Sequence, residues 1–171
     1  MTYWHANPGN LAELMMPFFD YFDKAMDDFR ENARQIFGCR GIFVPAVTMP
    51  GGTRHVCLAS HITNWTAGAG WIAQHYFDYW LYSGDYDFLE NRAIPFMKEA
   101  AQFYMDFIQW DESGWHICPS VSPENHTRHY CRHSHDLGNA SQPHDLGDGM
   151  QTSIDATMDV AVIRELFTNL L

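Results

Sequence analysis

A short segment that contains a proline and a glutamate, and directly follows a second proline, is the first candidate for acid–base chemistry. The segment is Ser120-Val121-Ser122-Pro123-Glu124-Asn125, and it directly follows Pro119. Proline fixes φ at about −65°, so the segment is stiffened on both sides of Val121. A carboxyl group on a stiff segment beside aromatic helices can be partly desolvated, which raises its pKa and allows it to act as a general acid. A solvated, purely structural glutamate is the alternative interpretation of Glu124.

Histidines and a cysteine follow this segment and are residue types that bind metals. They are His126, His129, Cys131, His133, His135 and His144. Imidazole and thiolate ligands suit zinc or copper. Their spacing, however, matches no standard zinc signature, and no His-Glu-x-x-His helix accompanies them. We therefore expect no metal site and no cofactor here, and interpret residues 126–144 as a polar cleft lining or a solvated loop, with metal binding as the alternative.

A third candidate lies at a predicted helix start, where Asn64-Trp65 precedes Thr66-Ala67-Gly68-Ala69-Gly70-Trp71. A phosphate-binding loop would require a lysine that is absent from this run. A tryptophan beside an amide fits a sugar better, because the ring stacks on an apolar sugar face while the amide binds hydroxyl groups. Glycine and alanine allow close approach, and Thr66 is a candidate cap, so a purely structural helix start is the alternative.

Four helices are predicted from apolar residues that recur at three- and four-residue steps. They cover residues 10–37, 67–82 and 87–110, and a last stretch that begins between residues 152 and 155 and runs to 171. Asn10 is a candidate N-cap, and Gly38 is expected to end the first helix. Pro17 and Pro95 are expected to kink or interrupt their helices, because proline lacks a backbone donor.

The remaining segments are loops with at most short strands. We expect strand-like pieces at 42–44 and 115–117, and one long loop from 111 to 151 that is typical of a functional segment. The predicted class is all-α, with about four long helices and this one long functional loop. The second helix has almost no charged face, which indicates burial between other helices.

Composition excludes several classes of protein. The chain has 171 residues, a net charge of −11, 46% apolar residues, 15% aromatic residues and 18% charged residues. So much apolar surface excludes a disordered chain, and the acidic balance argues against a nucleic-acid partner. The sequence contains no run of about 20 apolar residues, the length that a membrane-spanning helix requires. The four cysteines are too sparse for a disulfide scaffold and leave the compartment open. The aromatic excess suggests more buried surface than this length should need.

Taken together, several segments resemble the catalytic domain of glycoside hydrolase family 95, the α-L-fucosidases. The resembling pieces are Tyr3-Trp4, Asn10-Leu11, Gly38-Cys39-Arg40-Gly41, the run from Trp65 to His75, Ser83-Gly84-Asp85 with Phe88-Leu89, the run from Pro95 to Ala101, the run from Ser120 to Asn125, Thr157-Met158-Asp159, and the run from Ile163 to Phe167. Their order and spacing extend along essentially the whole chain.

This resemblance implies part of an (α/α)6 toroid, in which six helical hairpins surround a central cleft. It implies an inverting mechanism with Glu124 as the general acid, and substrate contacts by Trp65, Asn125 and Asp159. For Asp159, a polar anchor at the start of the helix is the alternative. The family's water-activating asparagines precede the segment at which this chain begins, and its acidic partner lies beyond the helix that contains Phe167. We therefore expect residues 1–171 to be a partial catalytic domain, incomplete at both ends and inactive alone.

The function implied is cleavage of terminal α-L-fucosyl or related α-L-galactosyl residues from oligosaccharides. The expected partners are the oligosaccharide substrate and the missing remainder of the catalytic domain, with no nucleic acid and no membrane. Residues 126–144 depart from the family pattern, so no contacts are carried over to them. A non-catalytic carbohydrate-binding or structural all-α module is the alternative, followed by a metal-binding protein that uses the histidines.

Overall fold

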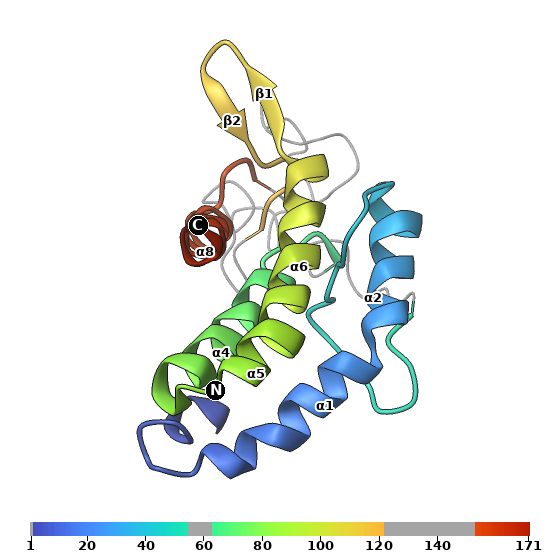
Figure 1. Ribbon diagram of the computed structural model, residues 1–171. Coiled ribbons are helices and arrows are strands. Elements are labelled where there is room, and N and C mark those ends of the chain that lie inside the picture. The colour runs from blue at the N-terminus through green and yellow to red at the C-terminus, as the bar shows by residue number, and fades with distance from the viewer. Residues whose placement is uncertain (1, 55–62, 122–152) are drawn as a thin grey trace, which may run out of the picture.

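The computed structural model describes residues 2–54, 63–121 and 153–171, and these residues are mostly helical, as predicted (Figure 1). The elements in chain order are η1 (Thr2–His5), η2 (Ala12–Met15), α1 (Met16–Lys24), α2 (Met26–Asn32), η3 (Ala33–Phe37), α4 (Gly68–Ser83), α5 (Tyr86–Phe88), η4 (Leu89–Ala93), α6 (Ile94–Phe107), β1 (Gln109–Asp111), β2 (Gly114–His116) and α8 (Thr157–Leu170). The class is all-α with one small hairpin, consistent with a toroid-type glycosidase domain.

The first predicted helix is confirmed in extent but is divided differently. Asn10 has a φ of 56° and lies before the first turn, so it is not an N-cap. Pro17 occupies the first turn of α1, where a missing amide donor costs no hydrogen bond. The interruption lies at Ala25, whose φ of −90° and ψ of 0° separate α1 from α2, and the two helices run in different directions in Figure 1. Gly38 ends the run with a left-handed φ of 68°, as predicted.

The second predicted helix is confirmed as α4, while the third ends earlier than residue 110. The helical run through α5, η4 and α6 stops at Phe107, because Ile108 is extended. Residues 109–111 then form β1, which pairs with β2 so that Trp110 faces Trp115. Gly114, with a φ of 130°, closes this turn. The strand expected at 115–117 is therefore present in part, and its partner replaces the last predicted helical turn.

The strand expected at residues 42–44 does not form. The Ile42 amide donates to the Glu99 carbonyl at 3.2 Å and the Phe43 amide to the Phe29 carbonyl at 3.1 Å, so this extended segment lies between α2 and α6 rather than beside another strand. Its apolar character reflects this burial, since Ile42, Phe43 and Val44 are all almost completely enclosed. A Cβ on Gly41 would lie 2.1 Å from the Glu99 carbonyl oxygen, which explains the glycine that precedes them.

Aromatic side chains fill much of the core between α1, α4 and α6. Tyr76 stacks on Phe96 with ring centroids 4.5 Å apart, and Phe19 contacts Tyr76 and Phe88 at 4.6 and 4.7 Å. The Tyr76 hydroxyl donates to Asp23 at 2.6 Å, so its polar atom is paired. Part of the aromatic excess in the composition is thus accounted for by packing within the chain.

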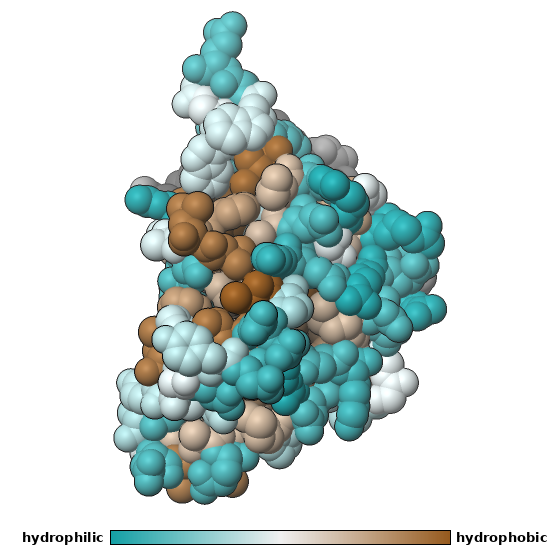
Figure 2. Space-filling view, viewed as in Figure 1, coloured by the Kyte–Doolittle hydropathy of each residue, from teal (hydrophilic) through white to brown (hydrophobic). Residues whose placement is uncertain are grey.

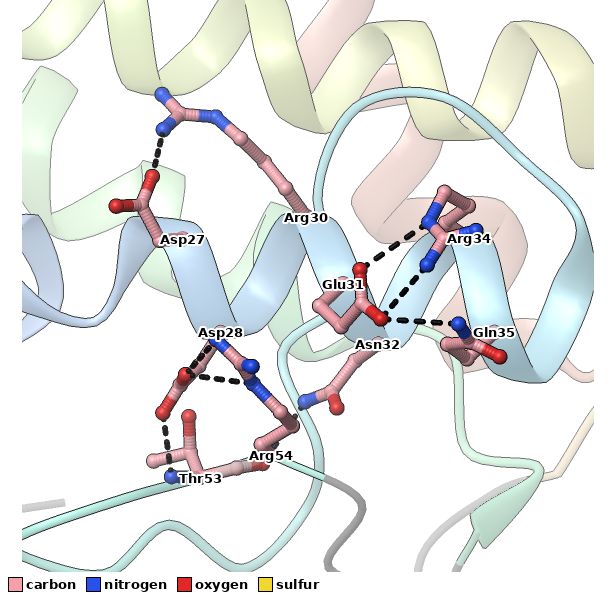
Figure 3. A network of polar contacts seen from close by, with 9 residues as sticks. All are labelled: Asp27, Asp28, Arg30, Glu31, Asn32, Arg34, Gln35, Thr53 and Arg54. Carbon is pink, nitrogen blue, oxygen red and sulfur yellow. Dashed lines mark hydrogen bonds and ion pairs between the residues drawn. The ribbon is translucent and has the colours of Figure 1, made fainter.

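Polar contacts hold the segment before residue 55 against α2 (Figure 3). Asp28 accepts hydrogen bonds from the Thr53 amide at 3.0 Å and from Arg54 at 3.1 Å. The buried Asn32 donates to the Thr53 carbonyl at 2.8 Å. On the other side of α2, Arg30 binds both carboxylate oxygens of Glu99 and thereby ties α2 to α6.

An apolar groove of about 470 Å³ lies between the hairpin, α6 and α8. Its lining comprises Met105, Ile108, Trp110, Trp115, Ile163, Arg164, Phe167 and Thr168. Figure 2 shows apolar side chains gathered below the projecting hairpin, in the region of α6 and α8. Among the described residues, no helix has both the length and the apolar character that crossing a membrane requires.

Candidate active site

The two segments that flank residues 122–152 in the sequence lie against each other. Ser120 and Ser153 exchange backbone hydrogen bonds of 2.9 and 2.7 Å, and the Ser153 hydroxyl donates to the Ser120 carbonyl at 3.0 Å. The Asp155 amide donates to the Ile117 carbonyl at 3.1 Å. We call this pair of segments, residues 117–121 and 153–159, the clasp. The clasp holds Val121 in place, and Val121 directly precedes Ser122-Pro123-Glu124, which we call the Ser-Pro-Glu segment.

Asp159 lies at the centre of the clasp, in the first turn of α8, and its side chain is completely buried. Its Oδ2 accepts a hydrogen bond from the Ser120 hydroxyl at 2.5 Å and one from the Val121 amide at 3.3 Å. The Ser120 hydroxyl in turn accepts from the Ala156 amide at 2.9 Å. A carboxylate in the first turn also interacts favourably with the helix dipole.

Burial raises the pKa of Asp159 to about 6, because the ionised form loses its hydration. The hydrogen bonds from Ser120 and Val121 oppose this shift. Asp159 Oδ1 and Thr66 Oγ1 are both buried without a hydrogen-bond partner among the described residues. The clasp therefore contains a carboxyl group that titrates close to neutral pH.

The start of α4 packs tightly on α8 and on the extended segment at Val44. A Cβ on Gly70 would lie 2.3 Å from Val162 Cγ1 of α8, and one on Gly68 would lie 2.2 Å from the Val44 carbonyl oxygen. Glycine is thus needed for close approach, as predicted. The other expectation for this run, that Thr66 caps the helix, is wrong. The N-cap position is Ala67 and no side chain caps it, while the Thr66 carbonyl accepts a hydrogen bond from Tyr104 at 2.7 Å.

Trp65 joins the same region from the other side. Its side chain is only 7% exposed, and its ring meets Trp71 edge-on with centroids 5.7 Å apart. It belongs to a small apolar cluster with Ala67, Val121 and Val162. The structure therefore brings Trp65 and Asp159, two of the residues singled out in the sequence, to the same short segment at Val121.

The other two predicted site residues, Glu124 and Asn125, lie outside the described residues, as does the histidine-containing stretch 126–144. Glu124 follows Val121 by three positions in the sequence. Within the described ranges, no group of three or more histidine, cysteine, aspartate or glutamate side chains is arranged to hold a metal ion.

A second polar cluster was not predicted from the sequence. His116 Nδ1 lies 2.6 Å from Asp155 Oδ2, and His116 Nε2 lies 2.7 Å from the Ser113 hydroxyl. This order of groups resembles a nucleophilic triad, yet the Ser113 hydroxyl donates to Asp111 Oδ1 at 2.6 Å, so its proton is directed to that carboxylate and not to the imidazole. The hydrogen bond to Asp155 raises the pKa of His116, and Asp111 adds to this shift. We interpret the cluster as a link from the hairpin to the clasp.

Sequence comparison decides the family. The profile of the glycosyl hydrolase family 95 catalytic domain matches residues 1–171. The chain belongs to this family. This family 95 chain is 27% identical over 177 residues to "Alpha-L-fucosidase 2" of Arabidopsis thaliana. The alignment covers 99% of the chain but 19% of that relative. It is also 27% identical over 121 residues to "Alpha,alpha-trehalose phosphorylase" of Geobacillus stearothermophilus, which covers 71% of the chain and 15% of that protein. The family 95 chain thus spans about one fifth of the length of its fucosidase relative, and its resemblance to the family is confirmed.

Proposed function

We propose that this chain contributes the general acid, Glu124, to an inverting glycoside hydrolase that releases terminal α-L-fucosyl residues from oligosaccharides. The observation that carries the proposal is the family match across residues 1–171, which includes the Ser-Pro-Glu segment. The name of the Arabidopsis relative supports fucose as the sugar. Related α-L-galactosyl residues form the second substrate class in this proposal.

The chemistry needs two groups on opposite sides of the sugar. Glu124 would give its proton to the glycosidic oxygen as the bond to the anomeric carbon breaks, while a base takes a proton from the water that attacks the other face. In inverting enzymes these two groups are separated by roughly 6.5–9.5 Å. We place the base and its water-binding residues in the remainder of the catalytic domain, so the 171-residue chain alone should not turn over substrate.

Sugar contacts are proposed for Trp65 and Asn125. Trp65 offers an aromatic ring next to Val121, with an indole Nε1 that has no hydrogen-bond partner among the described residues. Asp159 was assigned to the same role from the resemblance, and its complete burial in the clasp leads to the more specific role argued in the next subsection.

The direct test is substitution of Glu124 in the full-length protein. With an α-L-fucosyl oligosaccharide as substrate, Glu124→Gln should lower kcat by roughly 10²–10⁴-fold, the contribution of a positioned general acid. Binding of L-fucose, measured by calorimetry, should be retained because the amide has the size of the carboxyl group. Glu13→Gln, on the exposed face of η2, is the matched control and should have the wild-type kcat. Wild-type turnover by Glu124→Gln would remove Glu124 from the acid role.

Similarity to a phosphorylase calls for a second arm of this experiment. The same assay is run with and without inorganic phosphate, and the products are separated by chromatography. Hydrolysis predicts free L-fucose at a rate that does not depend on phosphate. Formation of a sugar 1-phosphate would instead assign phosphorolysis to the protein.

A further inference from the structure

We propose that Asp159 is a positioning residue for the acid step, because it holds Ser120 and Val121 and thereby fixes the direction in which the chain enters the Ser-Pro-Glu segment. This inference rests on the proposed function of Glu124. It gives Asp159 a role other than sugar contact, argued from the hydrogen bonds that its Oδ2 accepts from Ser120 and Val121.

The contacts of Asp159 are directional and involve consecutive residues. One carboxylate oxygen receives the Ser120 hydroxyl and the Val121 amide, so both the side chain and the main chain of the segment are held. Ser153 holds the Ser120 backbone with hydrogen bonds in both directions. The Val121 side chain is 5% exposed and packs in the cluster that contains Trp65 and Val162. Val121, the residue directly before Ser122-Pro123-Glu124, is therefore fixed through its amide and its side chain.

A buried carboxyl group is a costly way to connect two segments. Apolar residues of similar volume often stabilise a fold as well as buried charged groups or better, since charged groups lose their hydration. The raised pKa of Asp159 is a sign of this cost. An apolar contact, however, does not specify direction, whereas a carboxylate that accepts from a hydroxyl and an amide does. The clasp thus gives up stability for a defined geometry at Val121.

Defined geometry matters because proton donation requires close contact. A general acid must lie about 2.6–3.2 Å from the atom that it protonates, and a misplacement of about 1 Å can lower the rate roughly 10²-fold. Glu124 is three positions from Val121. An altered path at Val121 would therefore impair proton donation before it impairs any step in which Glu124 takes no part.

The test uses two substrates of the full-length protein that differ in their need for an acid. The leaving oxygen of a fucosyl oligosaccharide must be protonated, whereas fluoride leaves α-L-fucosyl fluoride as an anion without protonation. Asp159→Ala should lower kcat on the oligosaccharide by about 10²-fold and leave kcat on the fluoride close to wild type. Asp159→Asn keeps an oxygen that can accept from Ser120 and Val121, so it should restore most of the oligosaccharide activity.

Two further variants keep the outcome decisive. Ser120→Ala removes only the hydroxyl that donates to Asp159. It should show the same selective loss of kcat on the oligosaccharide, but a smaller one. Asp106→Ala is the matched control, because Asp106 also anchors a chain segment, through the Arg40 amide and guanidinium, but on the exposed side of α6. It should change neither activity. A loss of folded enzyme lowers both activities equally, so the ratio of the two kcat values isolates the positioning effect.

Failure of this inference and failure of the proposed function give different results. If Glu124→Gln shows the selective loss on the oligosaccharide and neither Asp159→Ala nor Ser120→Ala does, the positioning role is wrong and the acid role stands. If Glu124→Gln lowers both activities equally or neither, the acid assignment itself is wrong.

Discussion

The buried carboxyl group of Asp159 lowers the stability of the fold at neutral pH, while its hydrogen bonds define the geometry of the clasp. Its pKa of about 6 means that the folded state binds a proton more tightly than the unfolded chain does. Because this folded-state pKa is raised for an acid, Asp159 favours folding most below about pH 4. That contribution is lost as the pH rises from there through 6. At neutral pH the ionised group is retained at a cost, while its hydrogen bonds hold the clasp together.

Removal of this carboxyl group should weaken the clasp locally. Asp159→Ala leaves the Ser120 hydroxyl and the Val121 amide buried without their acceptor, and each such loss costs about 1–3 kcal/mol. We expect amide hydrogen exchange at Ser120, Val121 and Ser153 to accelerate by one to two orders of magnitude. Asp106→Ala should leave these amides protected. Unchanged protection in Asp159→Ala would show that the clasp does not depend on this residue.

His75 should make the fold sensitive to acid. Its ring is buried between Trp4 and Phe18, with centroids 4.1 and 5.0 Å away, and burial lowers its pKa to about 4. In the unfolded chain an imidazole titrates at about 6.5. The unfolded state therefore binds a proton first as the pH falls, and stability decreases between about pH 6.5 and 4.

The measurement is the urea midpoint of the full-length protein at several pH values across this range, followed by tryptophan fluorescence. His75→Phe should flatten the decrease, because the aromatic packing is kept and the titrating group is gone. The exposed His5→Gln should leave the decrease as in wild type. An equally steep decrease in His75→Phe would assign the acid sensitivity to other groups.

At this scale the sequence predicts residue types better than their partners. The Ser-Pro-Glu segment and Asp159 were both recognised, but the bond between Asp159 and Ser120 joins residues 39 positions apart and has no local signal. The contact between His116 and Asp155 likewise joins residues 39 positions apart and has no local signal in the sequence. Thr66 has a sequence typical of a cap, yet its carbonyl is taken by Tyr104 and α4 begins without it.

Among the elements, the contact of α4 with α8 depends on a single missing side chain. A Cβ on Gly70 would lie 2.3 Å from Val162 Cγ1 and 3.2 Å from the Tyr104 hydroxyl. Gly70→Ala should therefore destabilise the fold by about 1–3 kcal/mol through overpacking, even though alanine is the better helix former by about 1 kcal/mol.

The compensating change tests this contact. Val162→Ala removes the methyl group that the new Cβ would meet, so the double variant should be more stable than the sum of the two single changes predicts. The coupling is measured as the difference in unfolding free energy around the four-protein cycle. Strict additivity would show that the α4–α8 approach is not limited by Gly70.

The elements were predictable where apolar spacing is long and regular, and not where a local alternative competes. Residues 12–37, apart from the break at Ala25, residues 68–83 and most of 87–110 are helical because their apolar residues recur at helical steps. The last residues of the third run were assigned to the helix, but Gly114 permits a hairpin that recruits 109–111 as a strand. Residues 42–44 have a strand-like composition only because they are buried between helices.

On the scale of the molecule, the described residues combine a closely packed aromatic core with apolar side chains that remain exposed. Met105 and Trp110 are 65% and 76% exposed, and both line the groove between the hairpin, α6 and α8. The composition predicted such an excess, and the structure locates part of it. Neither the toroid as a whole nor the second catalytic group follows from the physical patterns in 171 residues, so both came from the family resemblance.

A prediction for the chain by itself follows from the two-sided chemistry. The isolated 171-residue chain should release no nitrophenol from an aryl α-L-fucoside in a colorimetric assay, because our proposal places the base that activates water in the remainder of the catalytic domain. The full-length protein is the positive control under the same conditions. Turnover by the isolated chain, abolished by Glu124→Gln, would show that all catalytic groups lie within it.

The anomeric form of the first product tests the central claim most directly. The full-length protein is mixed with an α-L-fucoside, and the released sugar is followed by proton NMR before mutarotation equilibrates it. Inverting hydrolysis through Glu124 predicts that β-L-fucose appears first and that Glu124→Gln releases none on the same time scale. Initial release of α-L-fucose, or an unchanged time course in Glu124→Gln, would contradict the account.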